Sequence, residues 1–275
     1  MTARNALVLG GGGPVGAAWL SAALSELVAA GLPLGESGVV LGTSAGAVSG
    51  AWLTMDPDGL PEVPQRMVKR ARQHAAALAA GQGDQGLFQR LLAESGGDVR
   101  KIARAAIATF PPMTAEQGEA LWSEMLPQGQ WPANLRAAAV NAETGAAHAW
   151  SSTDGIPLAV AVSTSTAAPG FAAPVSVDGS IWVDGGVRSG TNADLIADLA
   201  APGRVLVLAP IGGDGLAREE ASLTERGYRV RVIVAERFYG PMTDLLEPGF
   251  VDLATTVGAR QARDCVADLA TWWNA

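Results

Sequence analysis

The stretch that decides the fold is Gly38-Val39-Val40-Leu41-Gly42-Thr43-Ser44-Ala45-Gly46. Its apolar start is typical of a buried strand, and the sequence from Ala45 to about Met55 is typical of a helix. The glycines of this G-x-S-x-G pattern allow the backbone to turn sharply and to hold the Ser44 hydroxyl at the end of a sheet. Ser44 is therefore a candidate nucleophile, and the alternative is a structural turn that only caps the helix.

A second strand–turn–helix unit lies at the start of the chain. Residues 5–9 are apolar enough for a buried strand, residues 10–13 are four glycines, and Pro14 suits the first turn of a helix that ends near Ala30. Two such units in succession predict a mostly parallel sheet with helices on both faces, which is a three-layer α/β/α arrangement.

The region from about residue 56 to 127 differs from its surroundings. It contains helical patterns broken by Gly and Pro and no evident strand, so we expect a helical insertion. Strand patterns then return, and we expect strands at 135–141, 146–151, 175–177, 180–183, 205–209 and 228–235, with helices at 158–165 and from 248 onward. No linker or repeat interrupts the chain, which predicts one domain over residues 1–275.

Charge and composition narrow the possible partners. The 275 residues carry a formal net charge of −8, which gives no general attraction to nucleic acid, and we expect no nucleic-acid partner. No apolar run reaches the roughly 18 residues of a membrane span, and no charged-then-apolar leader precedes the first strand. The single cysteine, Cys265, excludes an internal disulfide. We therefore expect a soluble cytoplasmic protein.

A serine nucleophile needs a base, and the histidines are poorly located for that role. Hydrolases with a catalytic triad commonly follow the order Ser, Asp or Glu, then His, but the only histidines are His74 and His148. His74 is expected to face solvent in the helical insertion, and His148 is expected at a sheet edge. The expected triad histidine is missing, so another base is required.

Asp184 is the best candidate base. It ends the predicted strand 180–183 and opens Asp184-Gly185-Gly186, where glycines allow a tight turn that aims the carboxylate into a cleft. An ionised carboxylate accepts a hydrogen bond from a serine hydroxyl. Asp178 is expected to be a hairpin-turn residue, and Asn192 and Asp194 are expected to cap a helix near residues 193–199.

The glycine loop supplies candidate oxyanion donors. Gly11, Gly12 and Gly13 leave the backbone uncovered, and the N–H groups of Gly12 and Gly13, with Ala45 as a third, could stabilise an oxyanion. The same loop also fits G-x-G-x-x-G, so an NAD(P)-binding oxidoreductase is an alternative. That fold requires an acidic residue after the second strand, whereas Glu36 precedes it, which weakens the alternative.

Taken together, the motifs resemble the patatin-like phospholipase family. The resemblance spans roughly residues 5 to 210, and Asn192 follows where that family often has an asparagine. Two departures, Val15 and Gly10, remove charges that the family loop often carries. The segments that carry the resemblance are Gly11-Gly12-Gly13-Pro14-Val15-Gly16, Gly42-Thr43-Ser44-Ala45-Gly46, residues 165–174 and Asp184-Gly185-Gly186.

The resemblance implies a patatin-like fold and a lipid acyl hydrolase with a Ser44–Asp184 dyad. It implies that Gly11, Gly12 and Gly13 form the oxyanion hole and that neither a cofactor nor a metal is required. The implied partners are phospholipids, lysophospholipids or other acyl esters, with transient contact to a membrane surface. A catalytically silent lipid-binding protein on the same fold is the remaining alternative.

Overall fold

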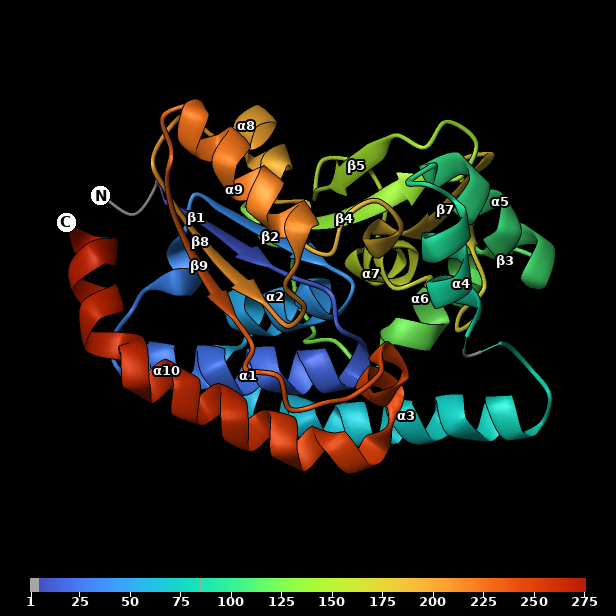
Figure 1. Ribbon diagram of the computed structural model, residues 1–275, viewed down its shortest axis with the longest axis horizontal. Coiled ribbons are helices and arrows are strands. Elements are labelled where there is room, and N and C mark those ends of the chain that lie inside the picture. Colours follow the sequence, from blue (N-terminus) through green and yellow to red (C-terminus); the bar gives the residue numbers. More distant parts are fainter. Residues whose placement is uncertain (1–4, 85) are drawn as a thin grey trace.

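The computed structural model describes residues 5–84 and 86–275, and these residues form a mixed α/β fold around a nine-stranded sheet (Figure 1). The strand order is β3-β6-β7-β4-β2-β1-β8-β9, and β5 also pairs with β4. The strands are β1 (Ala6–Leu9), β2 (Val39–Thr43), β3 (Met113–Thr114), β4 (Leu135–Asn141), β5 (Ala147–Trp150), β6 (Val175–Val177), β7 (Ser180–Asp184), β8 (Arg204–Ala209) and β9 (Arg229–Val234).

The centre of the sheet is parallel, as predicted. β1 lies between β2 and β8, and further parallel pairs join β2 to β4 and β8 to β9. Residues of β1 alternate between two cores: Leu7 and Leu9 pack into one hydrophobic cluster, and Ala6 and Val8 pack into another. Both faces of the sheet are thus buried, which confirms the three-layer arrangement.

Helices cover the two faces unequally (Figure 1). α1 (Gly13–Ala29), α2 (Ala45–Met55), α7 (Leu158–Ser165) and α10 (Val251–Asn274) pack on the larger core, and α8 (Ile196–Leu199) and α9 (Asp214–Glu225) cover the other. α10 packs closely along α1, because Gly258 leaves room there: a Cβ at this position would lie 2.4 Å from the Trp19 carbonyl oxygen. Since the larger core joins residues from Leu7 to Trp273, we propose that residues 1–275 form one domain.

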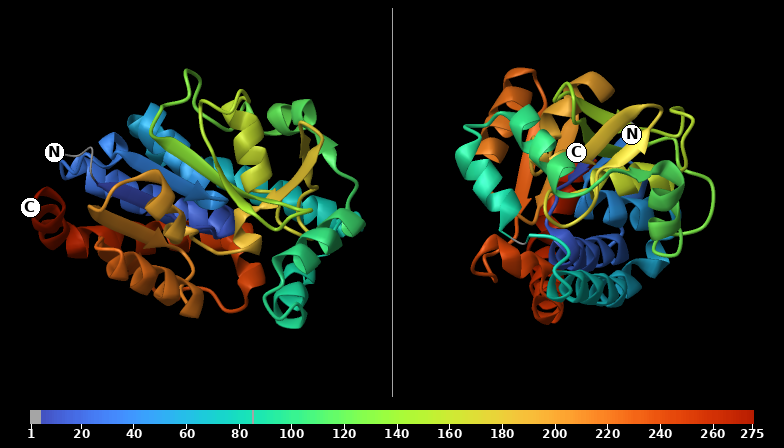
Figure 2. Two further views of the ribbon diagram at one scale, coloured as in Figure 1. Left: turned by 90° about the horizontal axis from the view of Figure 1, so that it is seen from above. Right: turned by 90° about the vertical axis from the view of Figure 1, so that its right-hand side faces the viewer.

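The insertion is helical, as predicted, and consists of α3 (Val63–Ala79), α4 (Leu87–Glu94), α5 (Val99–Thr109) and α6 (Ala115–Trp122). Figure 1 shows α4, α5 and α6 at the end of the molecule away from the C-terminus, whereas α3 runs alongside α1. In Figure 2 the α4 and α5 region lies at the opposite end from the C-terminus. The prediction of no strand in this region was wrong, because β3 pairs in parallel with β6. β3 has only two residues, which is too short to produce an alternating pattern. Short 3-10 helices lie at Leu34–Glu36, Pro57–Glu62, Gly185–Val187, Ala193–Leu195, Met242–Leu246 and Pro248–Phe250.

The register at β4 brings two distant strand ends together. Backbone hydrogen bonds join Val40 to Asn134 and Ala142 to Ile181, so β2 and β7 share one edge of β4, whereas Asn141 bonds to the β5 side. β2 runs parallel to β4 and β7 runs antiparallel, so the two strands approach each other end to end. Thr43 pairs with Ala138, and Asp184 pairs with Ala139. The residue after β2, Ser44, therefore meets the last residue of β7.

None of the helices in the described part of the chain is both long enough and apolar enough to cross a bilayer.

Candidate active site

Ser44 sits in a strained turn between β2 and α2. Its backbone has φ 52° and ψ −114°, and such positive-φ conformations of non-glycine residues concentrate at functional sites. The flanking glycines are required by close approach: a Cβ on Gly46 would lie 1.9 Å from the Leu9 carbonyl oxygen, and one on Gly42 would lie 2.4 Å from the Ala47 amide nitrogen. The Ser44 amide donates to Ser165 Oγ at 2.9 Å, which ties the turn to the end of α7.

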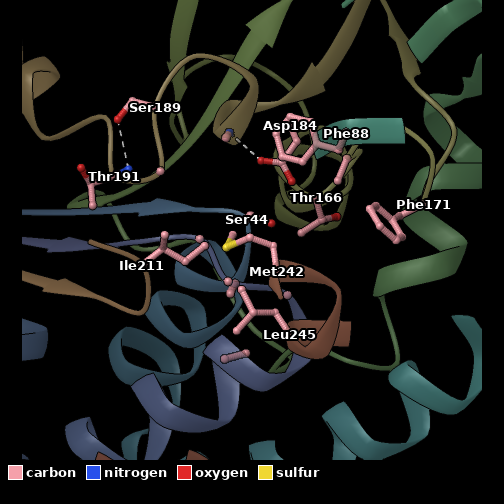
Figure 3. Close-up of a pocket in the computed structure, with 18 of the residues that line it drawn as sticks. Ser44, Phe88, Thr166, Phe171, Asp184, Ser189, Thr191, Ile211, Met242 and Leu245 are labelled. Atoms are coloured by element: carbon pink, nitrogen blue, oxygen red, sulfur yellow. Dashed lines mark hydrogen bonds between the residues drawn. The ribbon is translucent and has the colours of Figure 1, made fainter. Parts of the chain in front are cut away.

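Asp184 faces Ser44 from the end of β7 (Figure 3). The side chain is only 3% exposed, and its Oδ1 accepts a hydrogen bond from the Gly186 amide at 2.6 Å. Burial raises the pKa of Asp184 to about 7, and this increase is opposed by the Gly186 hydrogen bond and by the Ser44 side chain. The carboxyl is therefore poised to take up or release a proton near neutral pH.

The loop that follows Asp184 is held by Asn192. The Asn192 side-chain amide donates to Thr43 Oγ1 at 3.1 Å and to the carbonyl oxygens of Gly185 and Ser189 at 3.2 and 2.9 Å. Its Oδ1 accepts from Arg188 at 2.9 Å, and the residue is fully buried. Asn192 thus joins the end of β2 to the loop after β7, which fixes the two candidate catalytic residues relative to each other.

The predicted capping role of Asn192 and Asp194 was wrong. Neither side chain caps a helix: Asn192 bonds within the loop, and Asp194 forms an ion pair with Arg188. Buried Glu219 of α9 accepts from the Ala193 amide at 3.1 Å and from the Thr191 hydroxyl. These polar contacts fasten the loop to α9, and their residues lie too far apart in the sequence for a local pattern to connect them.

The glycine loop lies against Ser44. A Cβ on Gly11 would find Ser44 Cβ as its nearest neighbour at 3.4 Å, and the Gly11 amide donates to the Gly190 carbonyl at 2.7 Å. Among the described residues, no hydrogen bond is found for the amides of Gly12 and Gly13, where α1 begins. The amides of Gly12 and Gly13 are thus the ones left for a ligand, whereas Gly11 contributes contact with Ser44.

These residues line one cavity of about 680 Å³, a size typical of small-molecule sites. The lining combines Ser44, Asp184 and the glycine loop with apolar side chains from the insertion and from Met242–Leu246 (Figure 3). The apolar side chains include Met67, Phe88, Leu92, Phe171, Met242 and Leu245. The cavity is therefore a largely apolar space with the candidate chemistry in its wall.

The two histidines differ in their relation to this cavity. His74 lines it and is partly buried, which differs from the predicted solvent-facing position. Burial and the charge of Arg70 lower the pKa of His74 to about 4. His148 lies on β5, which among the strands of residues 5–84 and 86–275 pairs with β4 alone, as expected for a sheet edge. It packs against Trp150 and Trp182 and does not line the cavity.

A strand-end serine, a facing carboxyl and uncovered backbone amides at one cavity are the parts used by hydrolases that transfer acyl groups. A comparison with protein families agrees with this class. The model of the family described as patatin-like phospholipase matches residues 7–197, which is more than half of the chain. The chain therefore belongs to the patatin-like phospholipases, a family of lipid acyl hydrolases that act on lipid esters. No curated protein matches the chain.

Proposed function

We propose that this protein hydrolyses carboxylic ester bonds of lipids, with Ser44 as the nucleophile and Asp184 as the general base. The observation that carries the proposal is the end-to-end approach of β2 and β7 on one edge of β4. It brings the serine and the carboxyl together at a largely apolar cavity, so the proposed base is the carboxyl and not a histidine. The raised pKa of Asp184 supports the role of a base that works near neutral pH.

The first stage forms an acyl-serine. Asp184 accepts the proton of the Ser44 hydroxyl while Oγ attacks the ester carbonyl carbon. The N–H groups of Gly12 and Gly13 donate to the resulting oxyanion, and the dipole of α2, which begins at Ala45, favours the negative charge. The tetrahedral intermediate collapses, the bond to the alcohol breaks, and the alcohol leaves with the proton from Asp184.

The second stage releases the acid. Asp184, again ionised, accepts a proton from water, and the resulting hydroxide attacks the acyl-serine carbonyl. The oxyanion is held by the same glycine amides. Collapse of this intermediate breaks the bond to Oγ, and the proton on Asp184 returns to Ser44. One water is consumed, and one carboxylic acid and one alcohol are formed, so the two residues return to their starting states.

The lining of the cavity supports acyl-ester lipids, such as phospholipids or lysophospholipids, as substrates. Two of its apolar side chains are exposed to solvent, Leu92 at 46% and Met242 at 38%, which suits transient contact with a membrane surface. Action in the cytoplasm remains a prediction from the sequence.

The test is hydrolysis of p-nitrophenyl octanoate by the wild type and by Ser44→Ala and Asp184→Asn. Each variant is expected to lose about 10³-fold or more of kcat, since nucleophile or base is absent. Asp178→Asn is the matched control, because it removes a carboxyl from the turn of the β6–β7 hairpin at a positive φ that asparagine tolerates. Circular dichroism verifies that all variants are folded.

Three outcomes would argue against this proposal. Full activity in folded Asp184→Asn would remove the dyad. Absence of both turnover and fluorophosphonate labelling of Ser44 in the folded wild type would favour a silent lipid-binding protein. Stoichiometric binding of NAD or NADP in calorimetry would instead favour the oxidoreductase alternative.

A further inference from the structure

One face of α3 lines the cavity with side chains that the proposed chemistry does not use. Met67, Arg70 and His74 lie at positions i, i+3 and i+7, which share a helix face, and all three line the cavity. Met67 is buried, whereas Arg70 and His74 are partly buried. The wall of the cavity formed by α3 therefore carries a cation and an imidazole beside an apolar side chain.

Arg70 is a cavity cation for which the described residues supply no acidic partner. None of the ion pairs among the described residues involves it, and its guanidinium lies over the Trp122 ring at 5.5 Å from the ring centroid. The other cavity arginines differ, because Arg188 pairs with Asp194 and Arg218 is exposed on α9. A partly buried cation without a counter-charge is costly, and an anionic ligand would offset that cost.

Two side chains beside Arg70, those of Trp122 and His74, carry N–H donors. The buried Trp122 Nε1–H has no hydrogen-bond acceptor among the described residues, and Trp122 also lines the cavity. With its pKa lowered to about 4, His74 is neutral at pH 7 and offers one N–H donor beside Arg70. A guanidinium fork matches the oxygens of a phosphate or carboxylate.

We propose that Arg70 and His74 bind an anionic oxygen group of the substrate, a phosphate or a carboxylate, so that the protein prefers charged acyl esters to neutral ones. The inference rests on the proposed function, since it assigns the substrate class of the same cavity. It also makes Arg70 a specificity residue that the catalytic motifs do not reveal.

Binding is tested in the Ser44→Ala background, where no turnover interferes. Calorimetry compares three ligands with one octanoyl chain: 1-octanoylglycerol 3-phosphate, the octanoyl ester of glycolic acid, and neutral 1-octanoylglycerol. At least one charged ligand is expected to bind ten times more tightly than the neutral one or better. The phosphate and carboxylate ligands distinguish the two sources of the anionic group.

Variants of α3 locate the effect. The double variant Ser44→Ala, Arg70→Gln is expected to bind the preferred charged ligand at least ten times more weakly than Ser44→Ala does. Its affinity for 1-octanoylglycerol is expected to change much less. Arg70→Lys is expected to recover part of the loss, because it restores the charge without the fork. Arg72→Gln is the matched control, since Arg72 is exposed on the outer side of α3 and does not line the cavity.

Equal affinity for all three ligands, or equal losses in Arg70→Gln and Arg72→Gln, would overturn the inference. The inference would also be overturned if none of the three ligands bound. The proposed function is tested by a separate measurement. It fails if the wild type releases no octanoate from p-nitrophenyl octanoate. A charge preference in the Ser44→Ala protein would stand even then.

Discussion

The two sides of the cavity are built in different ways. The side that carries Ser44 and Asp184 consists of strand ends and a buried loop, in which Asn192 alone makes several hydrogen bonds. The side contributed by the insertion includes α4, which has no buried residue, and Leu92, which is 46% exposed. One side is fixed by its backbone and the other presents side chains from a loosely packed helix.

This difference separates chemistry from selection of the substrate. Hydrogen bonds and close backbone contacts hold the nucleophile and base to within the small tolerance that catalysis requires. The insertion contributes apolar surface and one unpaired cation, neither of which has to be held as accurately. Changes on the first side should therefore affect folding and kcat, whereas changes on the second should affect KM and the choice of substrate.

The largest effect is expected from Gly46→Val. Because even a Cβ there would lie 1.9 Å from the Leu9 carbonyl oxygen, the valine forces β1 and α2 apart, and we expect a loss of more than about 4 kcal/mol in the free energy of unfolding. Urea denaturation measures the free energy of unfolding, and failure to obtain folded protein would also agree with the prediction. Gly215→Ala in α9 is the control, since a Cβ there meets nothing within 4 Å. Equal stability of the two variants would contradict this account of the turn.

The next effect is the pH dependence of turnover. Asp184 acts as a base only when ionised, and its pKa is about 7. We expect kcat/KM for p-nitrophenyl octanoate to reach a plateau above pH 7 and to fall about tenfold per pH unit below it. A profile that stays flat down to pH 5 would show that Asp184 is not the base.

The same group links pH to stability. Its folded-state pKa lies above the ordinary value of 3.8, so the folded chain holds a proton that the unfolded chain releases. The stabilising contribution is complete below pH 3.8 and is lost as the pH rises through about 7. The asparagine side chain does not ionise, so Asp184→Asn does not lose this free energy as the pH rises. We therefore expect the variant to be more stable than the wild type at pH 8 by about 1 kcal/mol or more. A less stable variant in urea denaturation would argue against a buried carboxylate.

An effect on stability smaller than that of Gly46→Val is expected from Asn192→Ala. The change removes the side-chain hydrogen bonds to Thr43, Gly185, Ser189 and Arg188 and puts alanine at a φ of 52°. We therefore expect a loss of about 2–4 kcal/mol in unfolding free energy and a lower kcat. Denaturation and ester turnover measure both. Gln128→Ala is the control, since it removes one exposed hydrogen bond to the Ser123 carbonyl. A normal kcat in folded Asn192→Ala would show that the loop does not position Asp184.

Much of the first side could be predicted from the sequence, because its elements leave local patterns. Buried parallel strands are continuous apolar runs, and Ser44 and Asp184 each follow such a run beside glycines. The bounds of α2, β4 and α7 match the expected ones. Their meeting could not be predicted from pattern alone, because it depends on the register of two strands against β4.

Other parts left no such pattern. α9 was not predicted, because it buries only Leu216, Glu219 and Leu223 and its sequence is mostly polar. The contact of Ser165 with the Ser44 amide joins residues 121 positions apart, and no local spacing records it. The position of His74 depends on how α3 packs, which a helical period alone does not specify. Long-range polar contacts were thus the main omission.

The smallest expected effect tests the second side through a matched pair. Leu92 on α4 and Leu253 on α10 are both 46% exposed, but only Leu92 lines the cavity. Truncation to alanine should change the unfolding free energy of either variant by less than about 0.5 kcal/mol, because little apolar surface is buried. Only Leu92→Ala should raise KM for p-nitrophenyl octanoate, by about two- to fivefold, with little change for p-nitrophenyl acetate, because the longer chain loses an apolar contact. An equal rise for both esters, or an equal rise in Leu253→Ala, would mean that α4 does not contact the acyl chain and that the two sides of the cavity do not divide their roles as argued.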